Sequence, residues 1–281
     1  MSKQKILVPL ANPNTAPDLV RLAAGIIFGG TGEALALGVV EVPEHQSLSE
    51  GAVLARQTRR LLQRVLDIGL VENVEIRTVV RIARHAWQGI RDEVLEENID
   101  LVLIGWHGEL KGEDRIFGET IEELLKAPPC DIAVVKQRGL GQIRRILLPA
   151  RGGPHAELAL KIAISIAAKF ESAVTVLHVD PEGESGDNLH SEEAFAQFAN
   201  QCQDVCRVRL TSVASSSVVD AILKEAKKYE LVIMGATEHP EICGGYLFGQ
   251  IPEAVVAQAD ATVMVVKSRT CSHGDRSAEG D

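Results

Sequence analysis

The chain has 281 residues, which at roughly 150 residues per domain suits two domains of ordinary size, each able to bury a core. Hydrophobic residues make up 46% and charged residues 24%, a balance that excludes a disordered, collagen-like or low-complexity chain. Lys and Arg number 29 against 39 Asp and Glu, and the resulting net charge of −10 opposes contact with nucleic-acid phosphates or anionic lipid. We therefore expect no nucleic-acid partner.

Membrane and export signals are weak in this sequence. No apolar run reaches the length of about 18 residues that a membrane span needs, because Arg21, Lys161 and Lys169 interrupt the best candidates. The polar start, Met1 to Lys5, lacks the apolar stretch of a signal peptide. The five cysteines are odd in number and lack CxxC spacing, so neither a disulfide framework nor a metal site is expected. These features predict a cytoplasmic protein without direct membrane insertion.

Strand-like runs alternate with helical periodicity from the first residues onward. In chain order the first half is predicted to contain a strand at 5–10, a helix at 16–28, a strand at 34–42, a helix at 53–66, a strand at 74–80, a helix at 85–96, a strand at 101–105, a helix at 119–126 and a strand at 132–135. The second half is predicted to contain strands at 145–149, 174–179, 208–213, 231–234 and 262–266. Strands that alternate with helices indicate an α/β fold with a parallel sheet and right-handed crossovers.

The second half repeats the first. The segments that recur in the same order are Ile6-Leu7-Val8-Pro9 as Ile146-Leu147-Leu148-Pro149, Leu101 to Gly105 as Leu231 to Gly235, Phe117-Gly118 as Phe248-Gly249, and Ala133 to Lys136 as Met264 to Lys267. We therefore expect two tandem domains, at 1–138 and 143–268, each with a five-stranded parallel sheet of its own and helices on both faces. The glycine-containing stretch 137–142 is the predicted linker, and 269–281 is predicted to be a disordered tail.

A ligand in such a sheet is expected outside the carboxyl ends of the strands, where the strand order reverses. The loop after the fourth strand reads Gly105-Trp106-His107-Gly108, and Gly118-Glu119-Thr120 opens the next helix. Glycines admit an anion close to backbone amides, and a helix start adds partial positive charge, so this is the outline of a phosphate site. The alternative is that the same glycines serve chain geometry alone.

With these motifs the chain resembles a tandem universal stress protein. The family's nucleotide-binding members carry Gly, two residues, Gly, nine residues, Gly and then Ser or Thr, and Gly105, Gly108 and Gly118 reproduce that spacing. The resemblance implies flavodoxin-like or Rossmann-like domains and a pocket for ATP or AMP, which can bind together with Mg²⁺. It further implies that Pro9, Ala11 and Val39 lie near the adenosine.

Two departures from the family pattern concern the first half. Ala11 stands where the family often has an Asp that accepts from the nucleoside, and Glu119 stands where it has a hydroxyl, followed by Thr120. A carboxylate at a helix start stabilises the helix by about 0.3 to 1 kcal/mol but repels a triphosphate. We therefore expect poor ATP binding without Mg²⁺, and an improvement on replacing Glu119. His107 either touches the ligand or serves solvent and a local backbone bond.

The second half departs further from the pattern. Arg151 follows Pro149 by two, Glu238 stands in place of the middle glycine, the span from Gly235 to Gly249 has one residue too many, and Gln250 replaces the final hydroxyl. We expect this half to have lost the phosphate site and kept the fold.

Three functions remain open from the sequence. No GxSxG, Walker A or HExxH motif is present, so an enzyme is not expected. The first hypothesis is a nucleotide-binding regulatory module whose two halves pair through the strands at 132–135 and 263–266, as a homodimer would. The second is a regulatory or interaction domain without nucleotide, such as the cytosolic part of a membrane transporter. A slow ATPase or autophosphorylating protein is the third.

Overall fold

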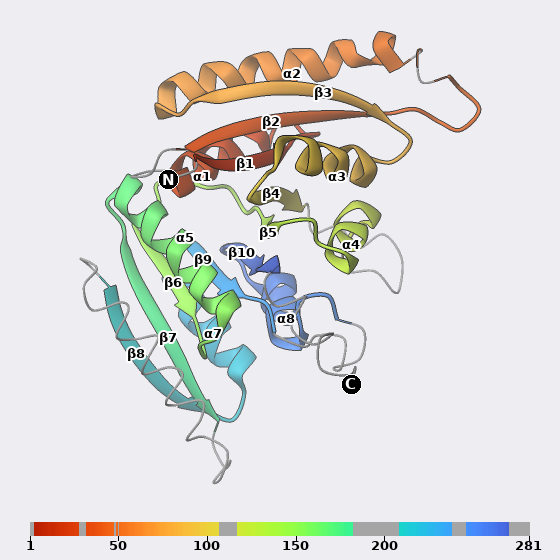
Figure 1. The fold of residues 1–281 in the computed structure, drawn as a ribbon. Coiled ribbons are helices and arrows are strands. Elements are labelled where there is room, and N and C mark those ends of the chain that lie inside the picture. Colours follow the sequence, from red (N-terminus) through yellow and green to blue (C-terminus); the bar gives the residue numbers. More distant parts are fainter. Residues whose placement is uncertain are drawn as a thin grey trace, which may run out of the picture.

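The computed structural model describes residues 3–27, 32–47, 49, 51–106, 117–181, 208–237 and 246–269. Its first half contains β1 (Gln4–Pro9), α1 (Ala16–Ile27), β2 (Gly32–Glu41), α2 (Gly51–Glu72), β3 (Ile76–Ala83), α3 (Ala86–Glu97), β4 (Leu101–Trp106), α4 (Glu119–Lys126) and β5 (Asp131–Lys136). Its second half contains β6 (Arg145–Pro149), α5 (Pro154–Phe170), β7 (Ala173–Pro181), β8 (Val208–Ser215), α7 (Val218–Ala226), β9 (Leu231–Gly235), α8 (Gln250–Gln258) and β10 (Thr262–Lys267). Figure 1 shows the two halves joined through β5 and β10 at the centre of the molecule.

The strands form one continuous ten-stranded sheet in the order β3-β2-β1-β4-β5-β10-β9-β6-β7-β8. Each half contributes five parallel strands, and β5 pairs with β10 in antiparallel register, Val134 opposite Val265. The predicted pairing of these two strands is confirmed, whereas the expectation of two separate sheets is wrong. The reason is that both strands are buried on both faces, and an unpaired edge there would leave a row of backbone groups without partners.

Within each half the strand order is that of the Rossmann fold, 3-2-1-4-5, and not the 2-1-3-4-5 order of flavodoxin. Of the two sheet orders that the resemblance implied, the flavodoxin-like one is therefore wrong. The order reverses between β1 and β4, which pair with Ile6 opposite Leu101 and Leu7 opposite Val102. The crevice that a ligand would use lies beyond the carboxyl ends of these two strands.

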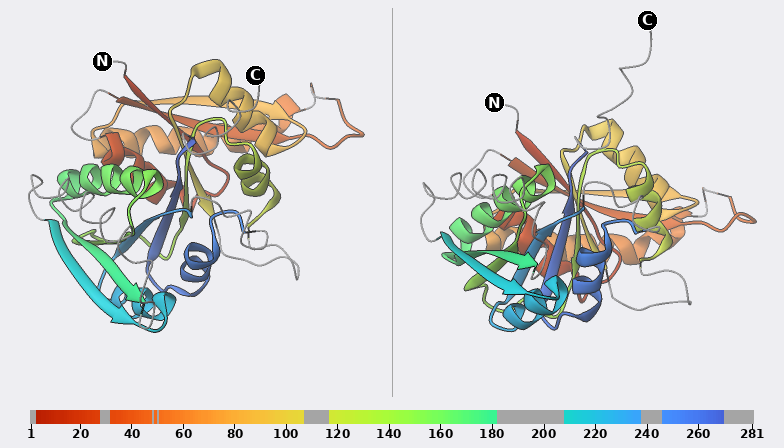
Figure 2. Two further views of the ribbon diagram at one scale, coloured as in Figure 1. Left: turned by 60° about the horizontal axis from the view of Figure 1, so that its bottom comes forward. Right: turned by 90° about the horizontal axis from the view of Figure 1, so that it is seen from below.

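Helices cover both faces of the sheet. Buried residues of α1, α2 and α5 form one hydrophobic cluster, and buried residues of α3, α4, α7 and α8 form another on the opposite face. Both clusters contain residues of both halves, so the core does not stop at the boundary between the repeats. In Figures 1 and 2 the sheet twists strongly, and the edge strands β3 and β8 run in clearly different directions.

The bounds of α2 and β3 differ from the sequence expectation. The helix continues to Glu72, six residues past the predicted end, and β3 begins at Ile76 and runs to Ala83. Leu70 and Val71 in the last turn of α2 are 81% and 83% exposed, so this turn carries no buried apolar stripe that a sequence pattern would reveal. The helix stops at Asn73, whose φ of 52° is left-handed.

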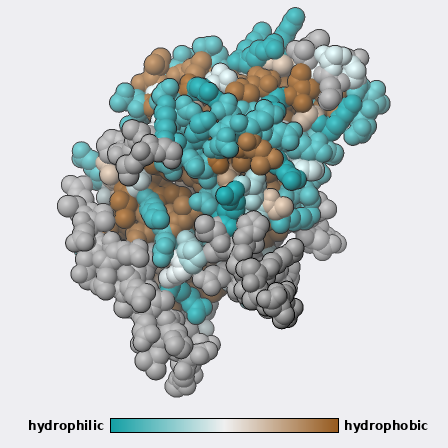
Figure 3. Space-filling view, viewed as in Figure 1, coloured by the Kyte–Doolittle hydropathy of each residue, from teal (hydrophilic) through white to brown (hydrophobic). Residues whose placement is uncertain are grey.

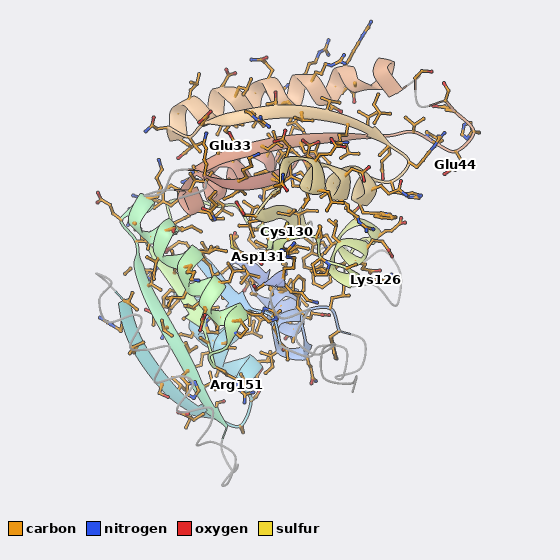
Figure 4. All side chains as sticks on the ribbon, in the orientation of Figure 1. Glu33, Glu44, Lys126, Cys130, Asp131 and Arg151 are labelled. Carbon is orange, nitrogen blue, oxygen red and sulfur yellow. The ribbon has the colours of Figure 1, made fainter. Side chains whose placement is uncertain are left out.

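The ends of β5 and β10 are tied together at the junction of the halves. Asp131 Oδ1 accepts hydrogen bonds from Ser268 Oγ at 3.2 Å and from the Arg269 amide at 2.8 Å. Figure 4 labels Asp131 and the neighbouring Cys130 near the centre of the molecule. Burial raises the pKa of the Cys130 thiol to about 12, so this cysteine stays protonated at neutral pH.

Among the described residues in Figure 3, hydrophilic ones predominate on this face, with apolar residues in several groups between them. Among the helices that the structure describes, none combines the length and the apolar character that crossing a bilayer requires.

Candidate functional site

The carboxyl ends of β1 and β2 bring three of the predicted residues to one edge of the sheet. Pro9 ends β1 opposite Leu37 of β2, and the amide of Leu10 donates to the Leu37 carbonyl at 2.8 Å. Val39, two residues further along β2, is half-buried. Ala11 directly follows this edge and is exposed. Its methyl group offers no acceptor to a nucleoside, as the sequence indicated.

Gly105 lies near the carboxyl end of β4, next to β1, and has a packing role of its own. A Cβ atom at this position would come within 3.0 Å of Leu19 Cδ1 in α1. The close approach of α1 to β4 therefore explains this glycine without any ligand. His107 and Gly108, the next two predicted residues, lie outside the described part of the chain.

Gly118 caps the start of α4 and faces open space. It is exposed, with φ −73° and ψ 161°, and no described heavy atom lies within 4 Å of where a Cβ would stand. Its carbonyl accepts from the amides of Ile121 at 3.0 Å and Glu122 at 3.1 Å. The amides of Glu119 and Thr120 precede these bonds in the first turn of α4. Such first-turn amides carry the partial positive charge of a helix start.

The Glu119 carboxylate interacts with the start of α3. Its Oε1 lies 3.7 Å from His85 Nδ1, and its side chain is 58% exposed. His85 is the N-cap of α3 and stacks on Trp87, with ring centroids 6.2 Å apart. The first amide of that helix, Ala86 N–H, is held by Glu41 Oε1 at 2.7 Å. The start of α3 is thus occupied by a carboxylate of the protein itself.

The equivalent glycine in the second half packs against a neighbouring side chain. Gly249, the N-cap of α8, has φ +103°, and a Cβ there would overlap Thr237 Oγ1 and lie 2.6 Å from Thr237 Cβ. Glu253 Oε1 accepts from the amides of Leu247 at 2.6 Å and Phe248 at 2.9 Å, and this carboxylate is 4% exposed. Burial raises the pKa of Glu253, although the amide hydrogen bonds counteract the shift. The two halves therefore differ in the surroundings of the same structural position.

The glycine that ends β9 is also closely packed. At Gly235 a Cβ would stand 2.7 Å from the His155 carbonyl carbon and 2.8 Å from the Ala156 nitrogen, so the start of α5 packs directly on the end of β9. Glu238 lies outside the described residues. Sequence reasoning missed Glu253 and Thr237, because their contacts with Phe248 and Gly249 depend on the fold.

A hollow of about 450 Å³ lies elsewhere, between Arg145, Val174, Val208 and Tyr229 near the amino ends of β6, β7 and β8. Ligands of parallel α/β sheets bind at the opposite, carboxyl ends of the strands. We therefore place the candidate site by the strand order and the start of α4, and not by the size of this hollow.

Fold and site together define a pair of Rossmann-ordered α/β units joined through their last strands. The family model described as the universal stress protein family matches the chain twice, at residues 3–136 and 142–267. The chain belongs to the universal stress protein family.

Three similar proteins extend this result. A universal stress protein from Archaeoglobus fulgidus has 16% sequence identity and a TM-score of 0.67, covering 94% of this chain and 98% of its own. The cytoplasmic domain of a prokaryotic cation chloride cotransporter has 14% identity and a TM-score of 0.60, covering 95% and 96%. The Na⁺/H⁺ antiporter NhaS5 of Synechocystis is 22% identical over 266 residues, or 92% of this chain. The chain spans only 38% of the length of that antiporter.

Proposed function

We propose that this protein is a regulatory module whose first half binds an adenine nucleotide weakly and whose second half does not. The observation that carries the proposal is the contrast between the two helix caps. No described heavy atom lies within 4 Å of where a Cβ at Gly118 would stand, whereas a Cβ at Gly249 would overlap Thr237, and the Glu253 carboxylate accepts from the two amides that precede Gly249.

The chemistry of the first half suits a phosphate group with a metal ion. The amides of Glu119 and Thr120 point out of the start of α4, where they can donate to phosphate oxygens. The carboxylate of Glu119 adds a negative charge to the same place, so we expect Mg²⁺ to improve the binding of ATP. AMP, with one phosphate, is expected to suffer less from this charge. We expect Pro9, Ala11 and Val39 to border the nucleoside, and Gly105, His107 and Gly108 to complete the glycine motif.

Gly118→Val tests the position of the site. The backbone angles of Gly118 admit a side chain, and no described atom lies within 4 Å of where its Cβ would stand. The variant is therefore expected to fold normally. Its branched side chain would fill the position proposed for the phosphate. Gly141→Val is a matched control, because a Cβ at Gly141 also has no described atom within 4 Å. We expect titration calorimetry to show at least tenfold weaker Mg-ATP binding for Gly118→Val alone. Unaltered affinity in Gly118→Val would place the site elsewhere.

A second candidate function is a regulatory domain of an ion transporter that works without nucleotide. The antiporter relative and the cotransporter domain favour it, because this chain matches 92% and 95% of its length to proteins of that kind. Native mass spectrometry of the purified protein separates the candidates. A co-purifying adenine nucleotide supports the first. Nucleotide-free protein that gives no heat with millimolar Mg-ATP or AMP supports the second.

We expect no catalytic turnover from either candidate. Phosphate release from Mg-ATP at the rate of a protein-free control is the expected result. Release that depends on Gly118 would instead favour a slow ATPase.

A further inference from the structure

The start of α4 is anchored by aromatic residues that reach into the second half. Trp106 ends β4 and Phe117 precedes Gly118, and the two rings pack with centroids 5.0 Å apart and planes tilted by 51°. Both residues are buried. The residues that leave β4 and enter α4 are therefore held to each other.

Phe248 of the second half is the third ring of this set. It packs edge-on against Phe117, with centroids 5.4 Å apart and an interplanar angle of 73°. Phe248 precedes the cap of α8 as Phe117 precedes the cap of α4, so the two equivalent helix starts meet through these rings. Phe248 is 0% exposed and lies on the cluster that covers this face of the sheet in both halves.

The backbone of Phe248 is fixed on both sides. Its amide donates to Glu253 Oε1 at 2.9 Å, and its carbonyl accepts from the Thr237 amide at 2.7 Å. Glu253 and Thr237 thus hold the backbone of Phe248 in place. A ring on a fixed backbone is a rigid support for the ring that packs against it.

Lys136 makes a second connection from Trp106 to α8. It ends β5 in register with Trp106, and its Nζ lies 5.9 Å from the centre of the Trp106 ring. The same Nζ donates to the carbonyls of Val256 at 2.5 Å and Ala257 at 2.9 Å, near the end of α8. A cation at the end of a helix is favourably placed for the helix dipole.

We propose that the second half positions the nucleotide site of the first, with Phe248 as the positioning residue that holds Phe117 and the start of α4. This inference rests on the proposed function for its ligand, but its structural claim is independent of any ligand. It assigns a role to the half that is proposed to bind no nucleotide: the residues around the start of α8 support the start of α4.

Phe248→Leu tests this role, because it removes the ring and keeps an apolar side chain. Phe170→Leu is the matched control. Phe170 is also an aromatic residue at a contact between the halves, since it packs against Gly25 and under Arg21 on the opposite face of the sheet. The two variants are compared by thermal unfolding, by Mg-ATP titration, and by hydrogen–deuterium exchange of the ligand-free protein over residues 117–122.

We expect Phe248→Leu to weaken Mg-ATP binding about tenfold and to speed exchange at 117–122, with Phe170→Leu within twofold of wild type in both. Equal effects of the two variants, or none from Phe248→Leu, would overturn the proposal. If wild type binds no nucleotide, the proposed function fails and the exchange comparison decides alone. In that case, faster exchange at 117–122 in Phe248→Leu but not in Phe170→Leu supports the positioning role. Equal exchange in the two variants rejects it.

Discussion

Gly118 and Gly249 occupy equivalent positions in the two halves but differ in backbone conformation and in surroundings. Gly118 has a negative φ that any residue adopts, and no described atom lies within 4 Å of where its Cβ would stand. Gly249 has φ +103° and lies against Thr237. The first is tolerant of a side chain, whereas the second combines backbone strain with steric overlap.

Alanine substitutions should separate these cases. We expect Gly249→Ala to lower the free energy of unfolding by about 2 kcal/mol or more, and Gly118→Ala to change it by less than about 0.5 kcal/mol. Urea unfolding of both variants measures the difference. Equal losses would mean that the two helix starts have the same surroundings, contrary to the structure.

Glu119 adds a negative charge to the start of α4, where we propose that the phosphates bind. Its carboxylate is more than half exposed, so solvent screens its repulsion of a triphosphate. We therefore expect Glu119→Ser to strengthen ATP binding without Mg²⁺ by about three- to tenfold, on the order of 1 kcal/mol, and with Mg²⁺ by less. Calorimetric titration with and without the metal tests this. Tight, metal-independent binding by wild type that is unaltered in the variant would show that Glu119 does not oppose the phosphates.

The start of the first strand in each half is held by an acidic residue just before the fourth strand. Asp100 Oδ2 accepts from the Lys5 amide at 2.8 Å in the first half. Glu230 Oε2 accepts from the amides of Arg144 at 3.1 Å and Arg145 at 2.8 Å in the second, and Glu230 Oε1 pairs with the Arg145 side chain at 2.7 Å. This contact between neighbouring elements is a shared property of the repeats.

Glu230 predicts a pH dependence of stability. Burial raises its pKa, but the hydrogen bonds from Arg145 and Arg144 outweigh burial, and the pKa in the folded protein is lower than the usual 4.5. The stabilisation from this lowered pKa is therefore present above about pH 4.5 and is lost as the pH falls through the lower, folded-state pKa. We expect Glu230→Gln to lower Tm by about 2 to 4 °C at pH 7 and to flatten the fall of Tm below pH 4.5.

Thermal melts from pH 7 to pH 3 provide the measurement. Asp67→Asn is a control, since Asp67 is exposed on α2. A Glu230→Gln curve that runs parallel to wild type across the acid range would contradict the account.

The sequence was sufficient for the elements whose pattern follows the core. The predicted helix at 119–126 and strand at 145–149 have the bounds of α4 and β6, because their apolar spacing or burial is regular. It was not sufficient for the end of α2, whose last turn faces solvent, or for Glu253. A carboxylate that accepts from amides four to six residues earlier has no distinct composition signal, and only the fold shows which amides it reaches.

The ten-stranded sheet and both hydrophobic clusters run through the two halves. Repeats with the same apolar last strand predict that these strands meet, but the same pattern also fits two separate sheets. Side chains that cross the boundary between the halves favour the single sheet, among them Lys136, Phe248 and Asp131. Their partners are distant in sequence, so no local pattern identifies them.

A chain truncated after residue 138 should reveal the exposed edge of β5. We expect it to form a concentration-dependent dimer in which β5 pairs with its copy, because β5 is apolar on both faces and loses β10. Light scattering after size-exclusion chromatography measures the mass. A stable, folded monomer would show that the pairing of β5 with β10 is dispensable.

The stoichiometry of Mg-ATP binding to the full chain, measured by equilibrium dialysis at saturating nucleotide, tests the central claim most directly. The account predicts one nucleotide per chain, displaced by AMP and lost in Gly118→Val, because the second half departs from the glycine motif and a side chain at Gly118 would fill the position proposed for the phosphate. Two nucleotides per chain, or one that survives Gly118→Val, would contradict it.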